Sequence, residues 1–127
     1  MKRSYKEEYQ YWLDSPALGE EEWKELSAIA EDEKEIESRF FAPLEFGTAG
    51  LRGVMATGLN RMNIHVIRWA TQAFAAVIKA EGEEACKKGV VVCYDCRLNS
   101  ERFAREAAGV MAANGIQLDK KGRPAFK

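Results

Sequence analysis

The groups best suited to bind an anion are concentrated in one short segment, residues 44–63, which reads LEFGTAGLRGVMATGLNRMN. It combines two arginines, Arg52 and Arg61, with the glycines Gly47, Gly50, Gly53 and Gly58. Glycines let backbone N–H groups come close to an anion, because no Cβ stands in the way. The Thr48 hydroxyl and the rigid guanidinium of Arg52 can both donate hydrogen bonds to a phosphate monoester. The alternative is a glycine-rich turn whose arginine pairs with a surface glutamate.

Two nucleotide-binding motifs are excluded by the same segment. Residues 53–58, GVMATG, have the spacing of a P-loop, but Leu59 and Asn60 follow where a lysine and a serine or threonine would have to reach phosphate and magnesium. No two glycines of the segment stand two residues apart, as the start of a dinucleotide fingerprint requires. A phosphate site that uses Arg52 is therefore the chemical hypothesis for this segment.

A second candidate is the turn that follows an apolar run, GVVVCYD, at residues 89–95. Asp95 and Arg97 can form a local ion pair that shapes this turn, or they can face a ligand, and both interpretations stay open. Cys93 and Cys96 stand close together, but the chain has only one other cysteine and one histidine, too few partners for a zinc site. We therefore expect free thiols and no metal site.

Alternating helices and strands are expected to position these groups. N-terminal helices are predicted within residues 5–30, followed by a charged, solvated helix face or connector at 31–40. The apolar segment at 64–78 predicts a helix buried on more than one side, and the run at 89–95 predicts an interior strand. A helix at 100–114 and a further strand would follow. This order indicates an α/β fold, with a mostly parallel or mixed sheet covered by helices and preceded by N-terminal helices.

In such a fold, ligands bind at the carboxyl ends of the parallel strands. This rule points to the turn at residues 95–100 and, if a strand precedes it, to the glycine-rich segment. Trp12, Trp23 and Trp69 lie on the apolar stripes of predicted helices, so we expect them to supply core.

The overall composition is that of a globular protein without a preference for polyanions. The 127 residues are 46% hydrophobic and 31% charged, with a net charge of −1, which provides no general attraction for nucleic acid or an anionic membrane. No apolar run approaches the ~20 residues needed to span a bilayer, and the N-terminus lacks the hydrophobic stretch of a secretory signal. We expect a cytoplasmic protein that binds neither nucleic acid nor membrane.

Several motifs resemble, in order and spacing, the N-terminal domain of the α-D-phosphohexomutases of the phosphoglucomutase and phosphomannomutase type. They are FGTAGLRG, NRMN, a helix containing ATQAFA, the run GVVVCYDCRLNSERFA, and AANGI, and the resemblance covers roughly residues 40–117. The resemblance implies an incomplete first domain at residues 44–118, an N-terminal helical extension at 1–43 and an atypical polar tail at 119–127.

The resemblance implies an isomerase of carbohydrate metabolism that works as an intramolecular phosphotransferase. Members of this family interconvert hexose 1-phosphate and hexose 6-phosphate. A phosphoserine gives its phosphoryl group to the sugar, and the other phosphate of the bisphosphate intermediate returns to the serine. Magnesium neutralises charge during each transfer.

Roles for individual residues follow from the same resemblance. Arg52 is implied to lie beside the phosphoserine, with further phosphate- or substrate-binding roles for Thr48, Gly50 and Arg61. The expected loop-shaping residues are Asn63, Asp95 and Arg97.

Two catalytic elements of the family are absent from these 127 residues. No T-A-S-H-N-P segment supplies the nucleophile, because the serines stand in other contexts, at Ser4, Ser15, Ser27, Ser38 and Ser100. No aspartate-rich D-G-D segment is present to hold Mg²⁺. The chain also departs from the family at Leu98, where relatives often have histidine, and in the polar ending QLDKKGRPAFK. We expect a domain with no catalytic nucleophile and no bound metal, inactive by itself, although the full-length family enzyme uses Mg²⁺.

An alternative is a stand-alone phosphosugar-binding or protein-interaction module that keeps anion recognition at Arg52. A fragment with only structural behaviour would instead show no response to a ligand. Any binding of hexose phosphate or hexose bisphosphate is expected to be weak, and whether the chain acts as an enzyme stays open.

We expect the chain to self-associate through an exposed sheet edge or an interdomain surface. Unpaired strand edges recruit partners because their free N–H and C=O groups can pair with another strand, and apolar patches do so because they gain by leaving water. Static light scattering should therefore give a mass that rises with concentration above the 14.3 kDa of one chain. A monomer at high protein concentration would contradict this expectation.

Overall fold

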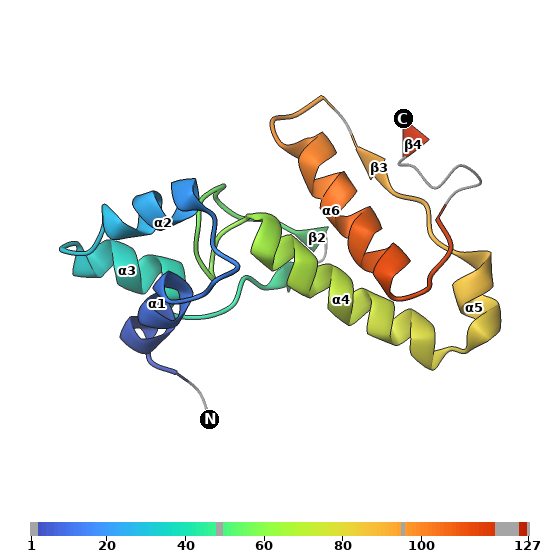
Figure 1. Cartoon of the computed structure of the whole chain (residues 1–127), viewed down its shortest axis with the longest axis horizontal. Coiled ribbons are helices and arrows are strands. Elements are labelled where there is room, and N and C mark those ends of the chain that lie inside the picture. Colours follow the sequence, from blue (N-terminus) through green and yellow to red (C-terminus); the bar gives the residue numbers. More distant parts are fainter. Residues whose placement is uncertain (1–2, 48–49, 95, 119–124, 127) are drawn as a thin grey trace. The chain divides into compact units, whose positions relative to one another are not determined.

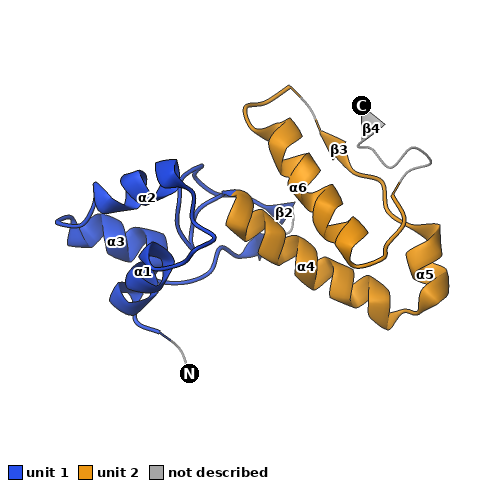
Figure 2. Cartoon of the chain, viewed as in Figure 1, with its two compact units in different colours: residues 1–63 blue, residues 64–127 orange. Residues whose placement is uncertain are grey.

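The computed structural model of the chain describes residues 3–47, 50–94, 96–118 and 125–126 (Figure 1). The chain divides into two compact units, residues 1–63 and 64–127 (Figure 2). The glycine-rich segment thus belongs to the same unit as the N-terminal helices. The three-part division expected from the sequence stays a prediction.

Three short helices begin the first unit: α1 (Tyr5–Leu13), α2 (Glu20–Ser27) and α3 (Glu33–Phe40). Two of them start at side chains that satisfy free N–H groups. Ser4 Oγ accepts a hydrogen bond from the Glu7 N–H (3.2 Å), and Asp32 Oδ1 accepts one from the Glu35 N–H (3.1 Å). The charged run at 31–40 is therefore a capped helix.

A small core holds these three helices together. It consists of Tyr9, Leu26, Ile36 and Phe40. Trp12 packs against this core as predicted, with its ring centroid 5.6 Å from that of Phe40 in an edge-to-face arrangement. The Tyr9 hydroxyl donates to the Leu26 carbonyl at 2.7 Å, which satisfies a buried polar pair and ties α1 to α2.

The first unit also contains a short hairpin. Its strands, β1 (Phe46–Gly47) and β2 (Gly50–Leu51), are antiparallel, with Phe46 opposite Leu51. The hairpin follows α3 and opens the glycine-rich segment.

The second unit is built on two helices, α4 (Ile64–Ala80) and α6 (Ser100–Ala113), which pack against each other. Ala75 of α4 and Met111 of α6 are buried together with Ile116. Arg68 Nε donates to Glu106 Oε2 at 2.6 Å and adds an ion pair between the helices. The position of α6 agrees with the helix predicted at residues 100–114.

The remaining elements of the second unit are short. Helix α5 (Glu83–Lys88) follows α4, and strand β3 (Cys93–Tyr94) pairs in parallel with β4 (Ala125–Phe126). Gln117 joins this region to α5, because its N–H donates to the Cys86 carbonyl at 2.9 Å while its carbonyl accepts from the Val90 N–H at 2.8 Å.

The described strands are shorter than the sequence predicted. Of the described residues 89–94 of that run, only Cys93 and Tyr94 form strand, and Val91 is 66% exposed. A strand becomes interior only when neighbouring strands and a helix layer cover it, and the two-residue β4 is the described partner of β3. The described residues form an α/β fold with six helices and short strand pairs. The mostly parallel or mixed sheet stays a prediction.

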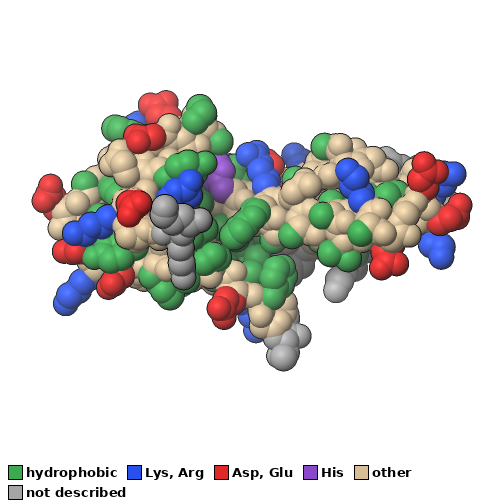
Figure 3. Space-filling model, turned by 90° about the horizontal axis from the view of Figure 1, so that it is seen from below, with side chains coloured by type: hydrophobic (Ala, Val, Ile, Leu, Met, Phe, Trp, Pro, Cys, Tyr) green, Lys and Arg blue, Asp and Glu red, His purple; other side chains and the backbone are tan. Residues whose placement is uncertain are grey.

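Several large apolar side chains lie at the surface. Trp23 and Trp69 are 51% and 55% exposed, so the prediction that they supply core is wrong. Phe74 and Val77 of α4 are also exposed, which contradicts the burial of this helix on more than one side along its length. Apolar side chains are visible on the face of the molecule drawn in Figure 3. None of the helices that the structure describes has the length and apolarity that a bilayer crossing requires.

The buried hydrogen bond of Tyr9 gives a direct test of the first core. Tyr9→Phe leaves the Leu26 carbonyl without its donor, so we expect the free energy of unfolding to fall by about 1–2 kcal/mol. Tyr11→Phe, on the exposed side of the same helix, is the matched control and should change it by no more than about 0.5 kcal/mol. Urea denaturation measures both, and equal effects would show that the Tyr9 hydroxyl does not hold the helices together.

Candidate functional site

The predicted phosphate-binding residue Arg52 follows directly after strand β2. Its side chain is exposed and makes no hydrogen bond or ion pair with any residue that the structure describes. The described part of the chain therefore gives no support to the alternative in which Arg52 pairs with a surface glutamate. Thr48, predicted beside it, lies outside the described residues, and Gly50 lies in β2.

Two glycines permit close packing around this segment. A Cβ on Gly53 would lie 2.8 Å from Leu44 Cδ1. Gly58 has φ +148°, and a Cβ there would lie 2.9 Å from Arg39 Cβ and 3.2 Å from the Arg39 carbonyl oxygen. A larger residue would strain the backbone at Gly58, so glycine lets the segment lie directly against α3.

Residues 54–63 are folded into a hydrogen-bonded turn. The Met62 N–H donates to the Val54 carbonyl at 2.8 Å, and the Ala56 N–H donates to the Met62 carbonyl at 3.2 Å. Asn63 is buried, and its Nδ2 donates to the carbonyls of Ala56 (2.9 Å) and Gly58 (2.8 Å). The predicted loop-shaping residue Asn63 thus bridges the two sides of this turn.

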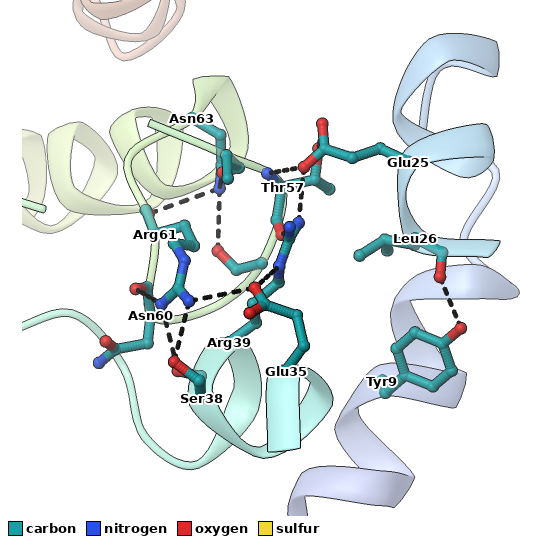
Figure 4. Close-up of polar contacts among 12 residues, drawn as sticks. Tyr9, Glu25, Leu26, Glu35, Ser38, Arg39, Thr57, Asn60, Arg61 and Asn63 are labelled. Atoms are coloured by element: carbon teal, nitrogen blue, oxygen red, sulfur yellow. Dashed lines mark hydrogen bonds and ion pairs between the residues drawn. The ribbon is translucent and has the colours of Figure 1, made fainter. Parts of the chain in front are cut away.

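An ionic network that the sequence did not predict attaches the turn to α2 and α3 (Figure 4). Arg39 Nη1 donates to Glu25 Oε2 at 2.6 Å and to the Thr57 carbonyl at 3.0 Å, while Arg39 Nε donates to Glu35 Oε2 at 2.7 Å. Thr57 in turn donates to the Glu25 carboxylate through its N–H (2.8 Å) and its hydroxyl (3.1 Å). The spacing of Glu35 and Arg39, four residues apart, was the only signal of this network in the sequence.

Arg61, predicted to bind phosphate, faces α3 in the structure. Its guanidinium donates to Ser38 Oγ at 2.9 Å and to the Ser38 carbonyl at 3.2 Å, and it lies 3.5 Å from Glu35 Oε2. The side chain is 12% exposed. Its contact with phosphate stays a prediction, and the described geometry gives it a role in joining the turn to α3.

The turn before α6 is described only in part. Asp95 lies outside the described residues, so whether it pairs with Arg97 or faces a ligand stays open. Arg97 and Leu98 are exposed, and Asn99 has a left-handed backbone with φ 66°. No group of three histidine, cysteine, aspartate or glutamate side chains suited to a metal ion occurs among the described residues.

The network shifts the acidity of its carboxylates. Burial alone would raise the pKa of Glu25, but hydrogen bonds from the Thr57 N–H, from Arg39 and from the Thr57 hydroxyl outweigh it, so this pKa is lowered. The pKa of Glu35 is also lowered, chiefly by its hydrogen bond from Arg39. Both carboxylates are therefore held in the charged form that Arg39 requires.

Comparison with known proteins places this arrangement in a family. Residues 43–122 match the family described as phosphoglucomutase/phosphomannomutase, alpha/beta/alpha domain I. The chain therefore belongs to the phosphoglucomutase/phosphomannomutase family, of which it contains domain I. No solved structure gives a significant match to it.

Individual relatives carry the names of several phosphosugar mutases. The chain is 39% identical over 116 residues to a phosphopentomutase of Homo sapiens, a match that covers 84% of this chain and 19% of the relative. It is 33% identical over 97 residues to a phosphoribomutase of Saccharomyces cerevisiae (75% and 15%), and 32% identical over 111 residues to a phosphomannomutase of Mycoplasma genitalium (85% and 20%). The chain thus spans no more than a fifth of the length of these three proteins.

The lowered pKa values predict how stability depends on pH. A carboxyl whose pKa is lower in the folded state stabilises the fold above its ordinary value of 4.5 and loses this contribution as the pH falls through the folded value. We therefore expect the free energy of unfolding to decrease below pH 4.5, and to decrease less steeply in Glu25→Gln. Denaturation at a series of pH values measures both slopes, with Glu21→Gln on the same helix as the control. Equal slopes for the wild type and Glu25→Gln would contradict this assignment.

Proposed function

We propose that this chain supplies the phosphate-facing part of domain I of a phosphosugar mutase of the hexose phosphate type. The reaction interconverts hexose 1-phosphate and hexose 6-phosphate through a phosphoserine and a bisphosphate intermediate. The observation that carries the proposal is that the family match includes a loop whose Arg52 is exposed and unpaired among the described residues.

The part played by Arg52 is electrostatic. Its guanidinium carries a permanent charge and several N–H donors in one plane, so it can hold two oxygens of a phosphoryl group as charge develops on them. Bonds of this kind stabilise a transferring phosphoryl group without any proton transfer by the arginine. Positioned charge alone does not complete the reaction, so we expect no turnover from this chain by itself.

Magnesium is assigned to no residue of this chain. The described residues contain no cluster of ligands that suits it, and the sequence contains no D-G-D segment.

A pentose phosphate is the second candidate substrate. The supporting observation is the name phosphopentomutase on relatives 39% identical to this chain. Pentose and hexose phosphates share the phosphate monoester that Arg52 would bind, so the loop described here suits either class of sugar.

Binding of a bisphosphorylated sugar by the chain tests the proposal. In a two-dimensional amide NMR titration with glucose 1,6-bisphosphate, we expect saturable shifts of Gly50, Arg52 and Gly53. Arg52→Ala should weaken binding by about ten-fold or more, because a charge-assisted hydrogen bond contributes about 1.5–3 kcal/mol. Arg105→Ala, which removes an exposed arginine of α6, is the matched control.

The outcomes separate the competing interpretations. Shifts that survive Arg52→Ala would place the phosphate elsewhere, and the absence of any shift would refute binding by this chain. Titrations with glucose 6-phosphate and ribose 5-phosphate compare the two sugar classes. A stand-alone binding module would bind with no need of other chains, and isolation of a mutase partner would support it over a catalytic domain.

A further inference from the structure

Thr57 lies at the centre of the contacts between the turn and the helices. Its side chain and backbone are almost fully buried, with 3% of the residue exposed. Its N–H and hydroxyl both donate to Glu25, and its carbonyl accepts from Arg39 (Figure 4). All three polar groups of this residue are therefore held by two helices at once.

Further hydrogen bonds connect Thr57 to the backbone near Arg52. The Asn63 side chain bridges the carbonyls on either side of Thr57, at Ala56 and Gly58. The Met62 N–H then binds the carbonyl of Val54, which is two residues after Arg52. Movement of Thr57 would thus move the backbone that carries Arg52.

Packing restricts the other side of the same segment. Gly53 lies so close to the Leu44 side chain that a Cβ would come within 2.8 Å of it, and the Leu44 N–H donates to the Leu59 carbonyl at 3.3 Å. Arg52 therefore stands between the hairpin and the turn, within the first unit.

The acidic side chains of this region pair with Arg39 and Arg61 and leave the charge of Arg52 without an acidic partner among the described residues, which favours an anion there. Glu25 and Glu35 neutralise Arg39, and Glu35 also lies 3.5 Å from Arg61. Arg39 and Arg61 are 13% and 12% exposed, whereas Arg52 is exposed and has no acidic partner among the described residues. Helices α2 and α3 thus supply carboxylates to Arg39 and Arg61, and the exposed Arg52 stays available to a ligand.

We propose that Glu25 and Arg39 are positioning residues for the glycine-rich segment: by holding Thr57, they fix the backbone from which Arg52 presents its guanidinium to a phosphoryl group. This inference rests on the phosphate-binding role of Arg52 proposed above. It gives α2 and α3 a part in ligand binding that requires no direct contact between these helices and the ligand.

The first experiment needs no ligand. Thr57→Val removes the hydroxyl and keeps the shape of the side chain, whereas Thr57→Ser keeps the hydroxyl and is the matched control. We expect Thr57→Val, and to a larger extent Glu25→Gln, to shift the amide resonances of Gly53, Val54 and Met55. Both changes should also speed hydrogen exchange at the hydrogen-bonded amides of Ala56 and Met62. Thr57→Ser and the exposed Glu21→Gln should leave these amides unchanged.

The second experiment measures coupling to Arg52. Glu25→Gln should weaken binding of glucose 1,6-bisphosphate by about three- to ten-fold in the wild-type background, as expected for coupled groups. In the Arg52→Lys background, where the planar guanidinium is already lost, the same change should have an effect of less than about two-fold. Equal weakening in the two backgrounds would overturn the inference, because a residue that only stabilises the helices has no reason to act through Arg52.

The two measurements separate failure of this inference from failure of the proposed function. If the wild type binds no phosphosugar, the proposed function fails, and unchanged amides at 53–55 in Thr57→Val would overturn the positioning as well. If Glu25→Gln does not fold, the Thr57→Val and Thr57→Ser pair carries both measurements. Lower thermal stability with unchanged amides at 53–55 would show that the network only holds the helices together.

Discussion

The arrangement of the first unit depends on the position of the Arg39 guanidinium. It contacts a carboxylate of α2 (Glu25), a carboxylate of its own helix (Glu35) and the carbonyl of Thr57 in the glycine-rich segment. The planar, permanently charged group accepts few geometries, so these bonds define direction as well as distance. Its loss would leave Glu25 without its cation and Glu35 with Arg61 alone, which couples the stability of the helices to the position of the turn.

The glycine-rich segment combines close packing with rigid attachment. Gly53 and Gly58 let the backbone approach Leu44 and Arg39, where a side chain would collide. Thr57, within the turn, forms hydrogen bonds with side chains of both α2 and α3. A group that stabilises a phosphoryl transfer must be held in the correct direction before the ligand arrives, because reorientation during the reaction would cost free energy. In the function proposed for Arg52, the attachment of the segment's backbone to α2 and α3 would supply preorganisation of this kind.

In the second unit, the apolar helix α4 is covered over only part of its surface. Helix α4 buries Ala75 against α6, yet Trp69, Phe74 and Val77 lie exposed. The family description places an alpha/beta/alpha domain over residues 43–122, and helices of such domains bury apolar faces against a sheet. The described strands of this chain are only two residues long, so they offer little surface against which the outer face of α4 could pack.

Local chemistry in the sequence determined where α1 and α3 begin, because Ser4 and Asp32 are caps that act within one turn. It also identified Arg52 and its glycines as the candidate site. The contact of Glu25 with Thr57, 32 residues away, was decided only by the tertiary structure, as was the attachment of Arg61 to α3. Tertiary packing likewise decided that Trp23 and Trp69 are exposed. The reason is that periodicity and charge show what a side chain can bury or bind, whereas the partner that covers or neutralises it comes from distant parts of the chain.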